Sequence, residues 1–171
     1  MLFRSEEFEK LSARNILRSG DEYGAMDAFR RIVAAHPEDQ NVRREYAGIL
    51  LQSGLAAEAL RQYSVLPQNE ETLRQLVAIH SALGDFARSE ATLRSILRDN
   101  PADIGLQVDL ANVLTWQGNF DGAVRIFREL HTTDPGNVDV ALAMGEALTW
   151  SGKGDEALVL FSRLLDRGLD G

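Results

Sequence analysis

The most constraining feature of the sequence is the regular spacing of glycine and proline. Five glycines alternate with four prolines, and each proline is followed by one of these glycines 17 residues later. The intervals from glycine to proline are 17, 13, 17 and 17 residues. The series is Gly20, Pro37, Gly54, Pro67, Gly84, Pro101, Gly118, Pro135 and Gly152. Two helix breakers in a period of about 34 residues predict helical hairpins that stack on copies of themselves.

The residues between the breakers have the pattern of amphipathic helices. In the copy over 104–137, apolar residues recur at intervals of three and four, which places them on one helical face. These residues are Leu106, Leu110, Val113 and Leu114. Gly118 is expected to end this helix, because glycine adopts the left-handed conformation without a Cβ clash. A second helix should follow, with Ala123 and Phe127 on its inner side, and end at Asp134-Pro135.

The positions of these residues resemble the pattern of the tetratricopeptide repeat (TPR) family. The copy over 104–137 supplies Gln107, Leu110, Ala111, Leu114, Ala123, Phe127 and Pro135, and the last copy supplies Ala141, Met144, Gly145, Leu148, Ala157 and Phe161. The resemblance covers about residues 6 to 171, as repeats 6–39, 40–69, 70–103, 104–137 and 138–171. It implies an all-α fold, a right-handed α-solenoid of five helix-turn-helix repeats with about ten antiparallel helices, and a single array over 1–171.

One repeat is shorter than the others. Four residues are missing between Gly54 and Pro67, which is close to one helical turn. We therefore expect the second helix of repeat 40–69 to be a turn shorter, with its buried face still in phase. The shortening is interpreted either as a length change absorbed by packing or as a functional hinge or docking notch.

Composition argues against two classes of partner. The net charge is −8 and the isoelectric point is about 4.9. Nucleic acids and anionic membrane surfaces bind cationic proteins, so neither is expected to bind here. No apolar run is long enough to cross a bilayer, so no membrane insertion by this segment is expected. Cysteine is absent, which excludes disulfides and thiolate metal sites.

No group of residues predicts catalysis, a metal site or a cofactor. The three histidines, His36, His80 and His131, fall at different predicted positions in the hairpins. We expect His80 to be packed in the core, with a pH switch as the alternative. Acidic pairs such as Glu70-Glu71 fall in first turns of helices, where they complement the helix dipole. The sequence thus predicts a protein that is not an enzyme and has no cofactor.

Helical geometry predicts which side of the first helices faces a ligand. At about 100° per residue, positions 105, 108, 112, 115 and 116 lie opposite the apolar face. The family resemblance implies that this side lines a concave groove. The N-terminal part carries Lys10, Arg44 and Arg74, interpreted either as a solvated face paired with glutamates or as a site for an acidic segment. The predicted partner-binding residues are Arg44, Arg74, Asn112, Thr115, Trp116, Glu146, Thr149 and Trp150.

The two tryptophans are the sharpest signal within that set. Trp116 and Trp150 lie one period apart and outside the apolar face of their own hairpins. Three interpretations remain open: packing against the following repeat or the turn, anchoring of a peptide, and stacking on a sugar. The segments 114–118 and 148–152 also resemble the Leu-x-Trp-x-Gly repeats of bacterial periplasmic and outer-membrane-associated arrays, including polysaccharide-export proteins. That resemblance implies a bacterial assembly or export role and a periplasmic location, with the cytoplasm as the alternative.

The predicted function is a non-catalytic protein–protein interaction scaffold that binds a protein or peptide segment in the concave groove. The alternatives are binding of a polysaccharide chain along the tryptophan face and structural self-association. Self-association would use an uncapped C-terminal end, where Leu158, Leu160 and Leu165 are expected to lack cover. We also expect the chain to be a segment of a longer protein.

Overall fold

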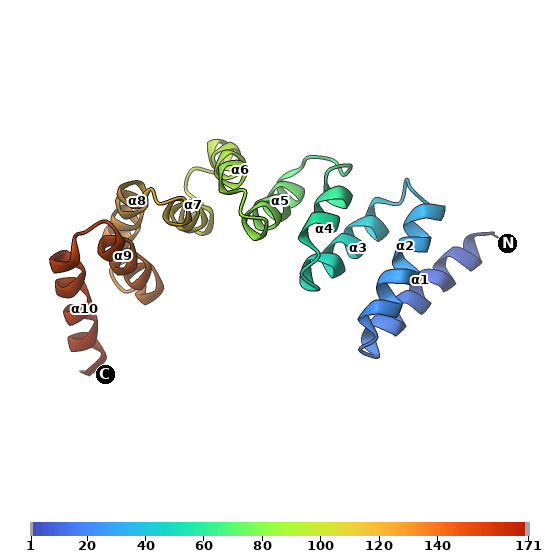
Figure 1. Ribbon diagram of the computed structural model, residues 1–171, viewed down its shortest axis with the longest axis horizontal. Coiled ribbons are helices and arrows are strands. Elements are labelled where there is room, and N and C mark those ends of the chain that lie inside the picture. The colour runs from blue at the N-terminus through green and yellow to red at the C-terminus, as the bar shows by residue number, and fades with distance from the viewer. Residues whose placement is uncertain (1, 170–171) are drawn as a thin grey trace. The chain divides into compact units, whose positions relative to one another are not determined.

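The computed structural model describes residues 2–169, and the side chains of residues 6–166. Over that range the chain folds into ten helices and no strand (Figure 1). They are α1 (Leu2–Arg18), α2 (Glu22–Ala35), α3 (Gln40–Gln52), α4 (Ala56–Tyr63), α5 (Glu70–Ala82), α6 (Phe86–Asp99), α7 (Ile104–Trp116), α8 (Phe120–Thr133), α9 (Val138–Trp150) and α10 (Gly154–Leu169). Each predicted repeat therefore contains two helices.

The chain forms two compact units. The first is Met1–Gly84, which contains α1 to α5, and the second is Asp85–Gly171, which contains α6 to α10. The boundary falls inside the predicted repeat 70–103, between its two helices. Within each unit, helices that follow one another in the chain pack together. The single array over 1–171 stays a prediction.

A glycine with positive φ follows the first helix of each repeat. These are Gly20, Gly54, Gly84, Gly118 and Gly152, with φ between 73° and 86°. At Gly54 the Leu55 N–H donates to the Leu50 carbonyl at 2.8 Å, and the Gly54 N–H donates to the Leu51 carbonyl at 3.1 Å. This pair of bonds is a Schellman motif, which satisfies the last carbonyls of α3. The predicted role of the glycine series as helix terminators is confirmed.

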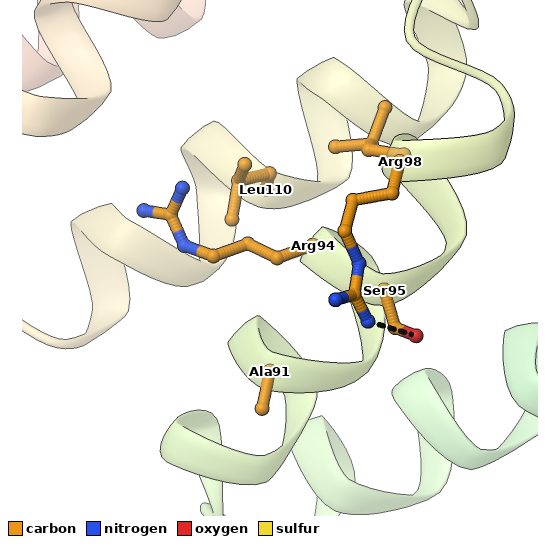
Figure 2. Close-up of a pocket in the computed structure, with 6 residues that line it drawn as sticks. Ala91, Arg94, Ser95, Arg98 and Leu110 are labelled. Carbon is orange, nitrogen blue, oxygen red and sulfur yellow. Dashed lines mark hydrogen bonds between the residues drawn. The ribbon is translucent and has the colours of Figure 1, made fainter.

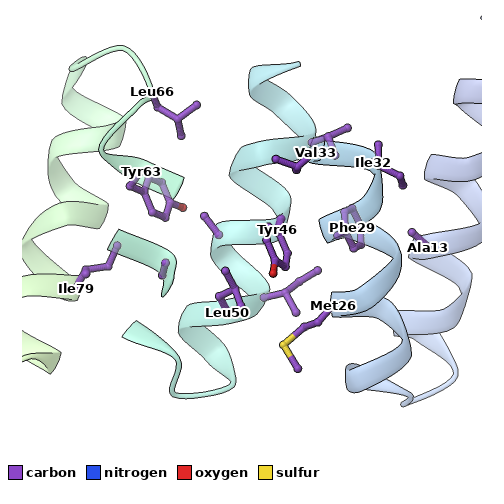
Figure 3. Packing of buried hydrophobic residues seen from close by; sticks show 14 of the residues in the cluster. Ala13, Met26, Phe29, Ile32, Val33, Tyr46, Leu50, Tyr63, Leu66 and Ile79 are labelled. Carbon is purple, nitrogen blue, oxygen red and sulfur yellow. The ribbon is translucent and has the colours of Figure 1, made fainter. Parts of the chain in front are cut away.

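The core of the first unit is built from the repeat positions that the sequence predicts. Phe29 of α2 and Tyr63 of α4 are almost fully buried in one apolar cluster (Figure 3). Ala13 of α1 and Ala47 of α3 are completely buried beside them. Small and aromatic side chains alternate here, which lets the backbones of paired helices approach closely at native packing density.

The short repeat has a short second helix, as predicted. α4 has 8 residues, whereas α2, α6 and α8 each have 14. The loss is larger than the predicted single turn, because α4 ends at Tyr63 and a turn follows. Leu66 in that turn is nevertheless buried, three residues after Tyr63, just as Ile32 is buried three residues after Phe29. The buried positions therefore stay in phase although the helix does not continue through them.

The second unit repeats the same packing with one variation. Phe127 of α8 is fully buried, and Ala111 of α7 at the paired position has no exposed surface. In the last hairpin that alanine is replaced by Gly145, and a Cβ there would lie 2.2 Å from the Phe161 ring. α9 and α10 therefore approach more closely than a side chain at position 145 would allow.

Candidate functional site

The predicted ligand-facing side of α7 and α9 is open in the structure. On α7 the inward side consists of buried residues, and the same pattern recurs on α9. The inward residues are Leu106, Leu110, Ala111, Val113 and Leu114 on α7, and Val140, Ala141, Met144, Gly145, Ala147 and Leu148 on α9. The opposite side of both helices is exposed or half-buried. α7 and α9 also contact each other, so their open sides are neighbours within the second unit.

Trp116 and Trp150 are exposed and held by phenylalanines. Their exposed fractions are 57% and 69%. The ring centroids of Phe86 and Trp116 are 5.7 Å apart with a tilt of 39°, and those of Phe120 and Trp150 are 6.3 Å apart and stacked at 21°. Each indole therefore packs on the first residue of the helix that precedes its own. Aromatic pairs at this separation are worth about 0.5–1.5 kcal/mol beyond their buried area.

Sequence reasoning missed the two phenylalanines. Phe86 and Phe120 lie one period apart, and each stands two residues after a terminating glycine. Because a tryptophan recurs two residues before Gly118 and Gly152, the segment Trp116-Gln117-Gly118-Asn119-Phe120 contains both kinds of aromatic residue. A search for periodic aromatics on both sides of the glycines would have found the pairs.

The polar residues predicted on this face differ in how free they are. The Thr115 hydroxyl donates to the Ala111 carbonyl and the Thr149 hydroxyl to the Gly145 carbonyl, both at 2.9 Å. These hydroxyls are therefore used within their own helices. Asn112 lies half-buried on the open side of α7 and Glu146 lies exposed on the open side of α9.

Apolar residues accompany the tryptophans on the same face. Ile104 and Val138 begin α7 and α9 and are 51% and 53% exposed, and Leu142 is 44% exposed. Val108 and Leu142 stand at the repeat position that holds Arg44 and Arg74 in the earlier repeats. We call the open sides of α7 and α9 the tryptophan face: Ile104, Gly105, Val108, Asn112, Thr115, Trp116, Val138, Asp139, Leu142, Glu146, Thr149 and Trp150.

The cations predicted in the N-terminal part are paired with carboxylates. Arg44 Nε lies 3.5 Å from Glu71 Oε1, and Arg74 donates to Glu70 Oε1 from Nε at 2.9 Å and from Nη2 at 2.8 Å. Arg44 and Arg74 thus each have a glutamate neighbour, and a role in binding an acidic segment stays a prediction. Surface pairs of this kind contribute little to stability, about 0–1 kcal/mol.

Lys10 is the most enclosed member of that stripe. Its Nζ lies 2.5 Å from Glu6 Oε1 and 2.7 Å from Asp39 Oδ2, and the side chain is buried. The hydrogen bond to Asp39 is the main reason that the pKa of Lys10 rises above its usual value. The same bond lowers the pKa of Asp39. Lys10 is therefore a structural cation that joins α1 to the turn before α3.

A cavity of about 560 Å³ in the second unit is a competing candidate. It is lined by α6 and by Leu110 of α7 (Figure 2). Arg98 Nη2 donates to Ser95 Oγ at 3.1 Å, and Arg94 Nε donates to Glu90 Oε1 at 2.8 Å. The bond from Arg94 lowers the pKa of Glu90. Because both arginines already have partners, the cavity has no obvious free group for an anion.

Other predicted features can be placed as well. His80 is buried on α5, as expected for a core residue. Within the described residues no cluster of side chains could hold a metal ion, and no helix is long and apolar enough to cross a bilayer. Of the three leucines expected to lack cover, Leu158 and Leu165 are exposed, but Leu160 is buried because it turns toward the hairpin core. Asp170 and Gly171 lie outside the described residues.

Consecutive helical hairpins, each with a left-handed glycine after its first helix, define a helical repeat protein of the α-solenoid class. A model of the tetratricopeptide repeat matches residues 80–130 and 114–170, and a second tetratricopeptide repeat model matches residues 17–69. The chain therefore belongs to the tetratricopeptide repeat family, and the predicted family and all-α fold class are confirmed.

Solved structures with the same fold include several MamA proteins. A crystal structure of MamA protein is 19% identical, with a TM-score of 0.77 over 94% of this chain and 90% of that chain. MamA 41-end from Desulfovibrio magneticus RS-1 is 13% identical, with a TM-score of 0.79 over 97% of each chain. At these identities the likeness shows the fold alone. No curated protein matches the sequence. Family membership itself supports an interaction scaffold with a protein partner.

Proposed function

We propose that this protein is a non-catalytic interaction scaffold whose tryptophan face docks a segment of a protein partner. The observation that carries the proposal is the exposure of Trp116 and Trp150 on a face that the repeat fold leaves open. Tryptophan is enriched among residues that dominate binding energies, because it buries a large area with few rotatable bonds.

The phenylalanine contacts add a physical reason for binding at these positions. Phe86 and Phe120 each pack on one indole and restrict how it can turn. Ordering a free side chain at an interface costs about 0.5–1.5 kcal/mol. An indole that is already held in place avoids part of that cost, so the two pairs are pre-organised anchors.

The remaining predicted residues have secondary roles in this proposal. Asn112 and Glu146 lie on the open sides of α7 and α9 and can form hydrogen bonds to a bound backbone or side chain. Thr115 and Thr149 contribute shape, because their hydroxyls are bonded to their own helices. For Arg44 and Arg74 to contact a ligand, the ligand would have to compete with Glu71 and Glu70.

Peptide selection and tryptophan fluorescence together test the proposal. Peptides are selected from a random-sequence display library on the purified chain, and their affinity is measured from indole emission or by calorimetry. We expect Trp116→Ala and Trp150→Ala each to weaken binding at least tenfold, a loss typical of interface hot spots. Tyr23→Ala is the control, since Tyr23 is an exposed aromatic residue on α2 outside this face. Selected peptides that bind the double tryptophan variant as well as the unmodified chain would contradict the proposal.

A polysaccharide chain is the second candidate ligand. The observation that favours it is the pair of exposed indoles one repeat apart, each supported by a phenylalanine. A flat apolar ring with a polar edge can stack on a sugar. The Leu-x-Trp-x-Gly resemblance supports a bacterial export setting for such a ligand. Oligosaccharides of varied linkage should then change the indole emission saturably, and no change with any of them would exclude this candidate.

A further inference from the structure

Charges are segregated between the first and second helices of the second unit. α7 and α9 contain no lysine, arginine or histidine, and their only charged residues are Asp109, Asp139 and Glu146. The arginines lie on the second helices: Arg88, Arg94 and Arg98 on α6, Arg125 and Arg128 on α8, and Arg163 and Arg167 on α10. In the two helices that carry the tryptophan face, every charged side chain is therefore acidic.

Several cations of the second unit pair with carboxylates other than Asp139 and Glu146. Arg94 binds Glu90, Arg128 binds Glu156 and Lys153 binds Asp121, at 2.8, 2.8 and 2.5 Å. Asp139 and Glu146 are both exposed, and no cation among the described residues lies within ion-pair distance of either. Two carboxylates on the open side of α9 thus remain available to a ligand.

The apolar character of this face is not required by the repeat fold. At positions equivalent to Ile104 and Val138, α3 has Gln40 and α5 has Glu70. At positions equivalent to Val108 and Leu142, the same two helices have Arg44 and Arg74. Helices of the same protein therefore fold with polar residues at these sites, so the apolar residues on α7 and α9 need another explanation, and a docked partner supplies one.

We infer that the segment bound by the tryptophan face is an apolar peptide that carries lysine or arginine beside its apolar residues. The inference rests on the proposed docking function and specifies its partner. Apolar side chains of the peptide would cover Trp116, Trp150 and Leu142, while its cations would lie opposite Asp139 and Glu146. Complementary charge favours association and rejects acidic competitors, because like charges brought together at an interface are costly. The expected charge of the bound peptide is therefore positive, whereas the acidic segment considered for Arg44 and Arg74 would be negative.

Competing occupants fit this surface less well. An anionic lipid surface or a nucleic acid would bring negative charge against the carboxylates of Asp139 and Glu146. A second copy of the chain carries a net charge of −8, so long-range repulsion opposes its approach. A dimer that dissociates when Trp116 and Trp150 are changed to alanine would still replace the peptide as the occupant and overturn the inference.

The test compares peptide pools selected on three forms of the chain. A random-sequence library is selected on the unmodified chain, on Asp139→Asn/Glu146→Gln and on Asp139→Lys/Glu146→Lys. We expect lysine and arginine to be enriched in the first pool, less so in the second, and replaced by acidic residues in the third. One basic peptide from the first pool should bind about two- to fivefold more weakly after each carboxylate is neutralised, with a larger effect at low salt. Glu129→Gln, which removes an exposed carboxylate from α8, should leave its affinity unchanged.

The outcomes separate this inference from the proposed function. A first pool without enrichment of basic residues, or an affinity insensitive to Glu146→Gln and Asp139→Asn, overturns the inference. If such peptides still require Trp116 and Trp150, the docking function stands and only the partner chemistry fails. Peptides that bind independently of both tryptophans overturn the docking function and the inference together.

Discussion

Replacing Gly54 by alanine should destabilise the protein, whereas the same replacement at Gly48, six residues earlier, should stabilise it. Gly54 has φ +76°, and a Cβ built there meets no atom within 4 Å. Gly48 lies inside α3 and also has open space around the position of a Cβ. The two sites therefore differ in backbone conformation and not in packing, and both belong to the first unit.

The change in unfolding free energy of each variant follows from two opposing contributions. Alanine in either position restricts the unfolded chain, which stabilises the folded state by about 0.4–1 kcal/mol. At Gly54 the left-handed conformation costs alanine about 1–2 kcal/mol, so a net loss of about 1 kcal/mol is expected. At Gly48 that cost is absent, and a gain of about 0.5–1 kcal/mol is expected. Because the unfolded-state contribution is common to both, the difference between the variants reports the left-handed backbone alone.

The assay is urea unfolding followed by circular dichroism, with thermal unfolding as a second measurement. A change of 1 kcal/mol should move the melting temperature by roughly 2–4 °C in a chain of this length. Gly54→Asn should fall between the unmodified chain and Gly54→Ala, because asparagine tolerates positive φ better than alanine does. Equal shifts of Gly54→Ala and Gly48→Ala in the same direction would refute the reasoning.

Three further predictions concern packing and charge. Phe127→Ala should lower the unfolding free energy by about 3–5 kcal/mol, since Phe127 is fully buried; a loss below 1 kcal/mol in urea unfolding would contradict its core role. Gly145→Ala should lower the unfolding free energy by about 1–3 kcal/mol through overpacking against Phe161, partly offset by about 1 kcal/mol from the better helix propensity of alanine. Adding Phe161→Leu to the same chain should restore the melting temperature. Stability should fall as the pH drops below about 3.8, the usual pKa of an aspartate, because Asp39 has a lowered pKa in the folded state and stabilises it only while ionised. Lys10→Met, compared by acid titration, should lose stability at neutral pH and show a shallower loss in that acid range.

The fold was predictable because a few residues at fixed positions in each repeat determine where the helices end and how they pack. The left-handed turn after α7 favours a glycine, which is Gly118, and small Ala111 is matched by large Phe127 in the paired helix. The same glycine recurs in every repeat, and a small residue faces a large apolar one in most of them. The sequence predicted that α4 is shorter than the other second helices, but not by how much. The residues after Tyr63 could either continue the helix or form a turn and still bury Leu66.

The candidate site was predictable only in outline. Helical geometry placed Trp116 and Trp150 on the open side, but their contacts depend on phenylalanines 30 residues away in the preceding helix. Pairing of Arg44 with Glu71 likewise depends on side-chain positions in different helices. The sequence period shows which face of its own helix a residue occupies, whereas these contacts depend on how neighbouring helices pack against each other. The binding residues therefore stay a prediction.

The aromatic pairs have a consequence for how such a chain can lengthen. Each pair joins a tryptophan to a phenylalanine of the hairpin before it, yet one five-residue segment, 116–120, contains the tryptophan of one pair and the phenylalanine of the next. Duplicating residues 104–137 in tandem would therefore create one additional complete pair without any new mutation. Surface area for recognition can then grow by whole repeats in evolution, and each duplicated repeat arrives with its anchor already supported.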